Sequence, residues 1–161
     1  MKSHYQPGFT LIELMIVVSL IGALMVVGSS LTTGWVASAQ INNASAAMKN
    51  AVYQARIAAL RNAGNKNTDQ PAASVCIEDG VIKVVAISNI MTTVVCETVY
   101  NKATQKLSIA KGASITQGGT ALSCMTFGPT GLALPFAGCS TDLTNKIKIE
   151  KSGESVEIDV I

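Results

Sequence analysis

The sequence has very little histidine, charge or aromatic content. His4 is the one histidine among 161 residues, and charged residues make up 14% and aromatic residues 4% of the chain. Histidine is the commonest general base and the commonest metal ligand in proteins. The other residues show no Ser/His/Asp set, no recognisable carboxylate pair and no metal-ligand spacing. The sequence therefore predicts a protein that is not an enzyme and that holds no cofactor or metal ion.

Charge is also missing from one long segment. No charged side chain lies between Glu13 and Lys49, and a run of about 20 apolar residues is enough to cross a bilayer as a helix. Residues 9–35 meet that length and end at Trp35, a residue type that suits the membrane–water interface. Lys2 before the run, with no charge at residues 14–48 after Glu13, predicts that the N-terminus is cytoplasmic.

An ordinary secretory signal peptide is the alternative interpretation of the same run. Such a peptide is cleaved after its apolar region at a small-residue pattern, and Ala37-Ser38-Ala39 fits that pattern. It would carry a positive charge, not an acid, before its apolar region. The acid at position 13 therefore favours a membrane helix that stays in the chain.

Beyond Trp35 the apolar residues follow a helical period. One stripe recurs at spacings of three and four residues, and a second apolar stripe lies on another side of the same helix. No proline interrupts residues 9–64, so we predict one helix with an amphipathic half at 36–64 and Gly64 as its left-handed cap. The first stripe consists of Ile41, Ala44, Met48, Val52, Ala55 and Ala59, and the second of Ala46, Tyr53, Ile57 and Leu60.

Two apolar stripes are more than a helix packed on one side of a domain needs. We infer that one stripe covers the domain and that the other meets neighbouring subunits. The alanine-rich stripe permits close approach, whereas the bulkier one offers more area to bury. The sequence does not assign the two roles, and the alternative is that both stripes belong to the core of the domain.

From residue 65 onwards the pattern is that of strands and turns. Alternating residues on both sides of Asp79-Gly80 predict a hairpin, and a second hairpin surrounds Ser152-Gly153. Together with the helix this gives an α+β fold, in which a long N-terminal helix with a transmembrane first half packs on an antiparallel β-sheet in a globular domain at 65–161. The expected strands are 75–78, 81–85, 91–100, 106–109, 122–127, 146–150 and 155–160.

Four cysteines, Cys76, Cys96, Cys124 and Cys139, lie beyond the apolar run. Their wide spacing without a C-x-x-C pair argues against a zinc site, and an even number on the exported side of a membrane predicts two disulfides. Three connectivities are open. We favour Cys76–Cys96 with Cys124–Cys139, because sequential pairs close the shortest loops. The alternative, four buried free thiols, would need a reducing compartment.

The N-terminal stretch combines a short basic leader, Gly8-Phe9, Thr10-Leu11-Ile12-Glu13 and an apolar helix. This pattern resembles the class III signal of type IV pilins and of the pseudopilins of type II secretion. The resemblance implies that residues 1–8 are a leader peptide, which a prepilin peptidase cuts between Gly8 and Phe9 before it N-methylates Phe9. It also implies that Glu13 is a filament-assembly residue, whose charge the Phe9 amine of a neighbouring subunit offsets.

Further stretches resemble the GspH/FimT branch of the same superfamily. They are residues 55–62 with the strand at 75–76, residues 125–133 with 138–139, and the hairpin at 147–156. This implies a minor pilin of the FimT/FimU type that primes a type IV pilus or joins it, with roles in twitching and DNA uptake. An H-type pseudopilin of type II secretion is the alternative, because the fold and the N-terminal signal would be the same.

The same resemblance implies the partners and the location of the chain. The partners would be the prepilin peptidase, the inner membrane, and other pilin or pseudopilin subunits bound through the N-terminal helix. Before assembly the chain would span the inner membrane once, with a periplasmic C-terminal domain, and it would later be part of a pilus or pseudopilus.

A nucleic-acid role is a further alternative. Some FimT-like proteins bind DNA through a basic C-terminal segment, but here residues 152–157 carry two acids and no base. Phosphate binding needs clustered lysine and arginine. Lys146, Lys148 and Lys151 could form a small patch, although we favour the explanation that they guard an exposed edge strand.

Overall fold

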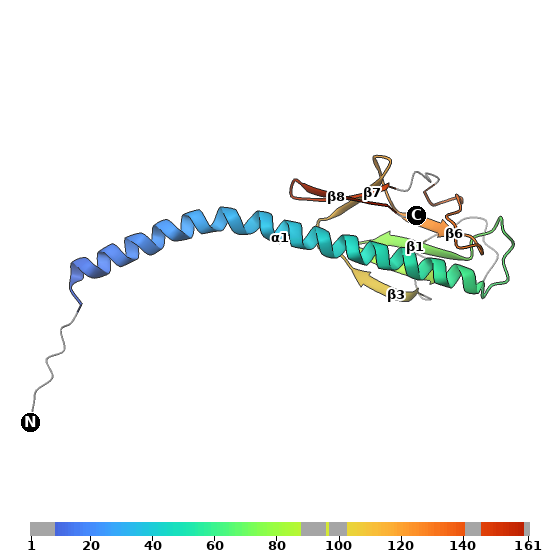
Figure 1. Ribbon diagram of the computed structural model, residues 1–161, viewed down its shortest axis with the longest axis horizontal. Coiled ribbons are helices and arrows are strands. Elements are labelled where there is room, and N and C mark those ends of the chain that lie inside the picture. The colour runs from blue at the N-terminus through green and yellow to red at the C-terminus, as the bar shows by residue number, and fades with distance from the viewer. Residues whose placement is uncertain (1–8, 88–95, 97–102, 141–145, 160–161) are drawn as a thin grey trace, which may run out of the picture. The chain divides into compact units, whose positions relative to one another are not determined.

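The computed structural model describes residues 9–87, 96, 103–140 and 146–159, without the side chains of 27–33, 103 and 104. The chain divides into two compact units, Met1–Val36 and Ala37–Ile161. One helix, α1 at Leu11–Arg61, contributes residues to both units (Figure 1). The prediction of a single long helix from the absence of proline is thereby confirmed.

The helix ends at an asparagine and not at the predicted glycine cap. Asn62 has a positive φ of 41°, whereas Gly64 is absent from the described residues with positive φ. The Asn62 backbone N–H donates to the Ala59 carbonyl (3.0 Å), and its side chain both donates to the Lys66 carbonyl (2.9 Å) and accepts from the Lys66 N–H (2.7 Å). The prediction of Gly64 was wrong because an asparagine tolerates left-handed backbone and can bond the following turn with its own side chain.

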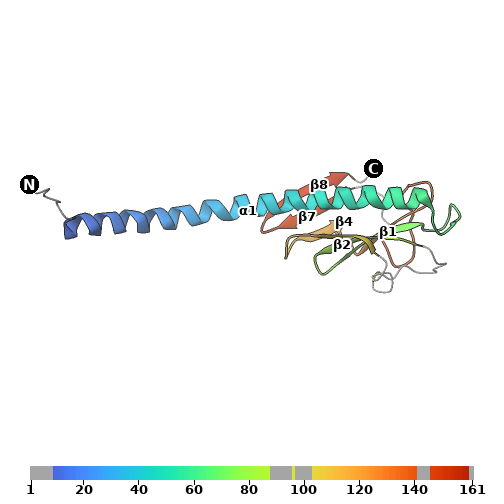
Figure 2. The ribbon, with the colours of Figure 1, turned by 90° about the horizontal axis from the view of Figure 1, so that it is seen from below.

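The predicted packing of a long helix on an antiparallel β-sheet domain is confirmed, and the described residues of the globular unit form two four-stranded antiparallel sheets. In the first sheet, the order is β3 (Ala103–Ser108), β2 (Val81–Ala86), β1 (Ala73–Glu78) and β6 (Cys124–Phe127). In the second, the order is β5 (Thr120–Ala121), β4 (Ser114–Gln117), β7 (Lys146–Lys151) and β8 (Glu154–Asp159). Figure 2 shows the C-terminal part of α1 running along strands of both sheets.

Both predicted hairpins are present, and their turns explain their register. Asp79 and Gly80, between β1 and β2, both have positive φ, as do Ser152 and Gly153 between β7 and β8. Two-residue turns of this kind match the right-handed twist of the strands they join. The strand expected at 91–100 lies outside the described residues except for Cys96, whose backbone is helical.

One hydrophobic core joins the helix to both sheets. The helix contributes the alanine-rich stripe, with Ala55 and Ala59 both 0% exposed, and Ala51 and Met48 beside them. Alanine leaves room for close approach, so the larger side chains of the strands fill the space opposite. These strand residues are Val75, Ile82, Val84, Met125 and Phe127 from the first sheet and Ile115, Ile147, Ile149 and Ile158 from the second.

Candidate functional site at the start of the helix

The first turn of α1 is closed by a reciprocal hydrogen-bond motif. The Glu13 N–H donates to Thr10 Oγ1 (3.4 Å), and the Thr10 N–H donates to Glu13 Oε2 (3.3 Å). The Thr10 hydroxyl also donates to Glu13 Oε2, at a distance of 3.3 Å. This is a capping box, in which the N-cap side chain and the acid three residues later satisfy each other's backbone donors. Glu13 is thus a structural residue of its own helix.

The capping box gives the acid a second favourable interaction. A helix N-terminus carries the positive end of the backbone dipole, and a carboxylate in the first turn is stabilised by about 0.3–1 kcal/mol at an exposed site. Glu13 is the acid in that turn. Glu13 was predicted as a site residue and Thr10 was not, although the T-x-x-E spacing before an apolar run is the signature of this motif.

We expect Thr10→Val to weaken the start of the helix. It keeps the side-chain volume and removes the hydroxyl, so the first turn should lose about 1 kcal/mol of N-cap stabilisation. The measurement is amide hydrogen exchange in detergent, which should become faster at Glu13 and Leu14, whose N–H groups donate to the Thr10 hydroxyl and carbonyl. Thr10→Ser, which retains the cap, is the matched control and should exchange like the unchanged chain. Equal protection in Thr10→Val and the unchanged chain would contradict the role of the cap.

Of the two residues at the predicted cleavage site, the structure describes Phe9 and does not describe Gly8. Phe9 precedes the helix and is 89% exposed. Gly8, the residue before the predicted scissile bond, lies outside the described residues. The exposed ring of Phe9 is accessible in the isolated chain.

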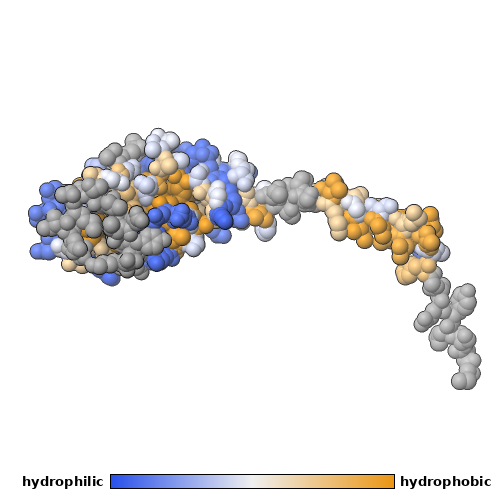
Figure 3. Space-filling model, turned by 180° about the vertical axis from the view of Figure 1, so that it is seen from behind, coloured by the Kyte–Doolittle hydropathy of each residue, from blue (hydrophilic) through white to orange (hydrophobic). Residues whose placement is uncertain are grey.

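Apolar side chains surround the helix after Glu13. Leu14, Ile16, Val18 and Leu20 are all exposed although they point to different sides of the helix, and Figure 3 shows the hydrophobic surface that such residues form along the N-terminal unit. A helix that is apolar all round needs an apolar environment. The Ser19 hydroxyl is satisfied internally, because it donates to the Met15 carbonyl at 2.8 Å.

Among the described residues, no helix combines the length and the apolar character that crossing a membrane requires. The predicted span at 9–35 includes residues 27–33, whose side chains lie outside the described residues.

The structure separates the two apolar stripes that the sequence left unassigned. Ala55 of the first stripe is 0% exposed, whereas Tyr53 and Leu60 of the second are 64% and 61% exposed. The alternative that both stripes are core is therefore wrong for the isolated chain. Leu60 lies against the turn at Gly131, where an added Cβ would meet its Cγ at 3.3 Å, and the next residue, Leu132, is also exposed.

The three lysines of the predicted patch do not share one face. Lys146 and Lys148 lie on the exposed face of β7, where Lys146 Nζ is 3.9 Å from Glu157 and Lys148 Nζ is 2.9 Å from Glu150. Lys151 Nζ instead donates to the Lys111 carbonyl at 2.7 Å. β7 also lies between β4 and β8, so the expectation of an edge strand was wrong. The carboxylates beside two of these lysines weaken any attraction for phosphate.

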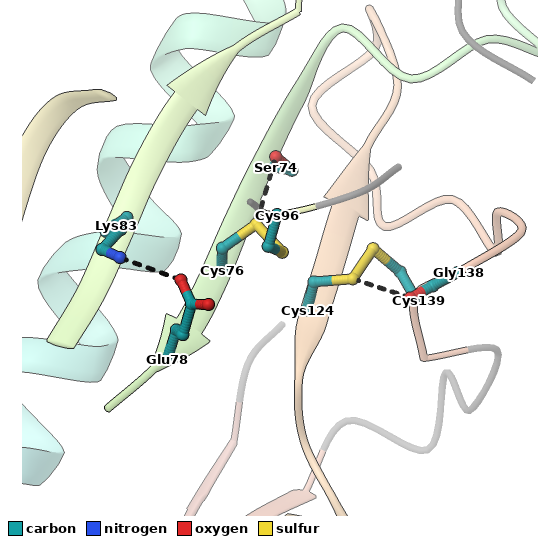
Figure 4. Close-up of a disulfide and its surroundings, with 8 residues drawn as sticks. All are labelled: Ser74, Cys76, Glu78, Lys83, Cys96, Cys124, Gly138 and Cys139. Atoms are coloured by element: carbon teal, nitrogen blue, oxygen red, sulfur yellow. Dashed lines mark hydrogen bonds and ion pairs between the residues drawn. A yellow bond between two sulfur atoms is a disulfide. The ribbon is translucent and has the colours of Figure 1, made fainter. Parts of the chain in front are cut away.

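The predicted disulfide bonds are present in the globular unit (Figure 4). One joins Cys76 to Cys96 and the other joins Cys124 to Cys139. They pack together in a second, smaller apolar cluster that also contains Ile87 and Phe136. This cluster covers the side of the first sheet that faces away from the helix.

The comparisons with known proteins support the N-terminal signal. Residues 3–29 match the family described as the prokaryotic N-terminal methylation motif. The chain therefore carries the N-terminal signal of the type IV pilin and pseudopilin class, which implies processing by a prepilin peptidase and an inner-membrane precursor that is later assembled. No curated protein and no solved structure matches the chain.

Proposed function

We propose that the chain is a minor pilin of the FimT/FimU type, which is cut between Gly8 and Phe9, methylated on Phe9 and incorporated into a type IV pilus. The observation that carries the proposal is the methylation motif at residues 3–29. Its signal leads into a helix that starts with a capped acid and continues with apolar residues on every side. The long helix packed on antiparallel sheets is a pilin-like architecture.

A membrane location before assembly forms part of the proposal. Residues 9–35 would hold the chain in the inner membrane with the leader, 1–8, in the cytoplasm. The globular residues, 65–161, and the amphipathic half of the helix, 36–64, would be periplasmic. Two disulfides support this placement, because disulfides persist in oxidising compartments such as the periplasm.

The exposed stripe of the helix supports an assembly role more directly. Tyr53 and Leu60 are large apolar side chains left open beside a well-packed core, and exposed apolar surface of this kind marks contact sites with other proteins. We propose that this stripe meets the neighbouring subunit of the filament.

Replacing both exposed residues should impair assembly without unfolding the subunit. In Tyr53→Ser/Leu60→Ser, we expect the free energy of unfolding to change by less than about 1 kcal/mol, because exposed positions contribute about 0.5 kcal/mol or less each. The fraction of the chain in sheared filaments should fall several-fold, measured by quantitative immunoblot. Lys49→Ser/Asn50→Ser, on the same helix, is the matched control and should leave incorporation unchanged. Equal incorporation in both double variants would contradict the contact.

Deleting the gene tests the choice between pilus and secretion pseudopilus. A minor pilin should be required for surface piliation and twitching, whereas an H-type pseudopilin should be required for protein secretion and not for piliation. Both phenotypes are scored in the same deletion strain, and a plasmid copy of the gene should restore them. Normal piliation with lost secretion would replace the pilus assignment by the secretion assignment.

A further inference from the structure

Two cysteines of different disulfides lie directly opposite each other in the first sheet. Cys76 on β1 is the register partner of Cys124 on β6. Both belong to the cluster on the side of the sheet away from the helix, whereas their neighbours Val75 and Met125 face the core. Their side chains therefore project from the same face of adjacent strands, as Figure 4 shows.

The hydrogen bonds around this pair define its spacing. The Ile77 N–H donates to the Ser123 carbonyl at 2.8 Å, so the neighbouring positions 76 and 124 form a non-hydrogen-bonded pair. Such pairs hold their Cα atoms about 4.5 Å apart, which is within the range of about 4.4–6.8 Å that a disulfide spans. The sheet alone therefore brings these two sulfurs within reach of each other.

The native disulfide partners of Cys76 and Cys124 are not held opposite them by strand pairing. Cys96 and Cys139 lie 20 and 15 residues along the chain from their partners, and neither belongs to a strand of the first sheet. Pairing of β1 with β6 therefore places Cys76 opposite Cys124 without a contribution from Cys96 or Cys139. We propose that Cys76 and Cys124 form a transient cross-strand disulfide during oxidative folding, and that the native bridges arise from it by internal exchange.

The exchange balances without a reductant. An external disulfide first oxidises the Cys76 and Cys124 thiols, taking two electrons from them and being reduced to two thiols. The Cys139 thiolate then attacks Cys124 Sγ, the Cys124–Cys139 bond forms, and Cys76 leaves as a thiolate. A second molecule of external disulfide oxidises Cys76 and Cys96 to the remaining bridge. In each oxidation the two protons of the cysteine pair end on the two thiols of the reduced external disulfide, and no net proton is released.

Trapping experiments on the full chain in detergent test the proposal. The chain is reduced, diluted into oxidised glutathione, quenched with acid at intervals, alkylated and mapped by peptide mass spectrometry. We expect Cys76–Cys124 to be the most abundant single bridge at early times, and to decline as Cys124–Cys139 rises. Absence of Cys76–Cys124 at every time point, or its accumulation without decay, would overturn the proposal.

Paired variants supply a second, independent readout. Cys96→Ser/Cys139→Ser leaves only the opposed pair, and Cys76→Ser/Cys124→Ser leaves only the two loop cysteines. We expect the opposed pair to form a bridge at a ratio of oxidised to reduced glutathione at least about tenfold lower than the loop pair requires, a difference of about 1.4 kcal/mol. Equal ratios, or a lower ratio for the loop pair, would overturn the proposal. Trapping in the unaltered chain decides the matter if either variant fails to fold.

Discussion

Glu13→Val should remove the chain from filaments while leaving its processing intact. The acid costs about 2.5–3.5 kcal/mol at the centre of a bilayer on insertion scales, so an assembly contact that offsets this cost contributes a similar free energy. Since 1.4 kcal/mol is a factor of ten, we expect incorporation into sheared filaments to fall by more than about tenfold. The gel shift that reports cleavage at Gly8-Phe9 should be unchanged, because both residues remain.

The capping box makes a matched set of variants informative. Glu13→Gln removes the charge and keeps a side chain that can close the box, because glutamine serves at this position as well as glutamate. Thr10→Val does the opposite, since it opens the box seen between Thr10 and Glu13 and keeps the charge. If the charge acts in assembly, Glu13→Gln should fail like Glu13→Val, and Thr10→Val should assemble.

The opposite pattern would replace the assembly contact by a structural role. Normal incorporation of Glu13→Gln, together with failure of Thr10→Val, would show that the closed first turn is what the filament requires. Normal incorporation of all three variants would contradict any role of this site in assembly. Immunoblots of the membrane fraction are needed beside those of the filaments, because a variant that is degraded would also be missing from the filament.

The sequence predicted the elements with strong local signals and missed those that depend on tertiary contacts. The hairpin at Asp79-Gly80 was predictable because the turn type requires two residues that accept positive φ. The strands β4 and β5 were missed because they are short, and because β4 buries the polar Gln117 beside Ile115, so that its sequence shows no apolar alternation. The division of the strands between two sheets was not predicted, because nothing in the local pattern says which strands pair across long separations.

The functional residues also divide into those with a local sequence signal and those whose role depends on tertiary contacts. Glu13 was found because a lone acid in an apolar run is conspicuous, whereas Thr10 was missed although its spacing to Glu13 was visible. The roles of Ala55 and Tyr53 required the structure, since both stripes have helical period and only packing decides which of them is buried. The lysines at 146 and 148 also required it, because their neighbours Glu150 and Glu157 come from β7 and β8 respectively.

Phe127→Ala should be the most destabilising single change in the globular unit. Phe127 is 0% exposed, ends β6 in the core shared by α1 and both sheets, and carries the guanidinium of Arg56 at 5.9 Å from its ring centroid. Truncating a buried phenylalanine costs about 3–5 kcal/mol, and the cation–π contact adds about 0.5–1 kcal/mol. Small domains have a total stability of about 5–15 kcal/mol, so we expect a large fall in the urea midpoint.

We expect Phe127→Ala to destabilise the globular unit because the ring is buried, and not because the turn after β6 is disturbed. Leu132→Ala is the matched control, because Leu132 is 66% exposed and lies in the same loop region. Only its backbone bonds the turn, through the Gly128 N–H at 2.9 Å, and alanine keeps that bond. We expect its free energy of unfolding to fall by less than about 0.5 kcal/mol. Both variants are compared with the disulfides oxidised, so that the bridges constrain the unfolded state equally. Phe127→Ala should have a much lower urea midpoint than Leu132→Ala, because only Phe127 lies in the core that α1 and both sheets share. Similar urea midpoints for the two variants would contradict the placement of Phe127 in that core.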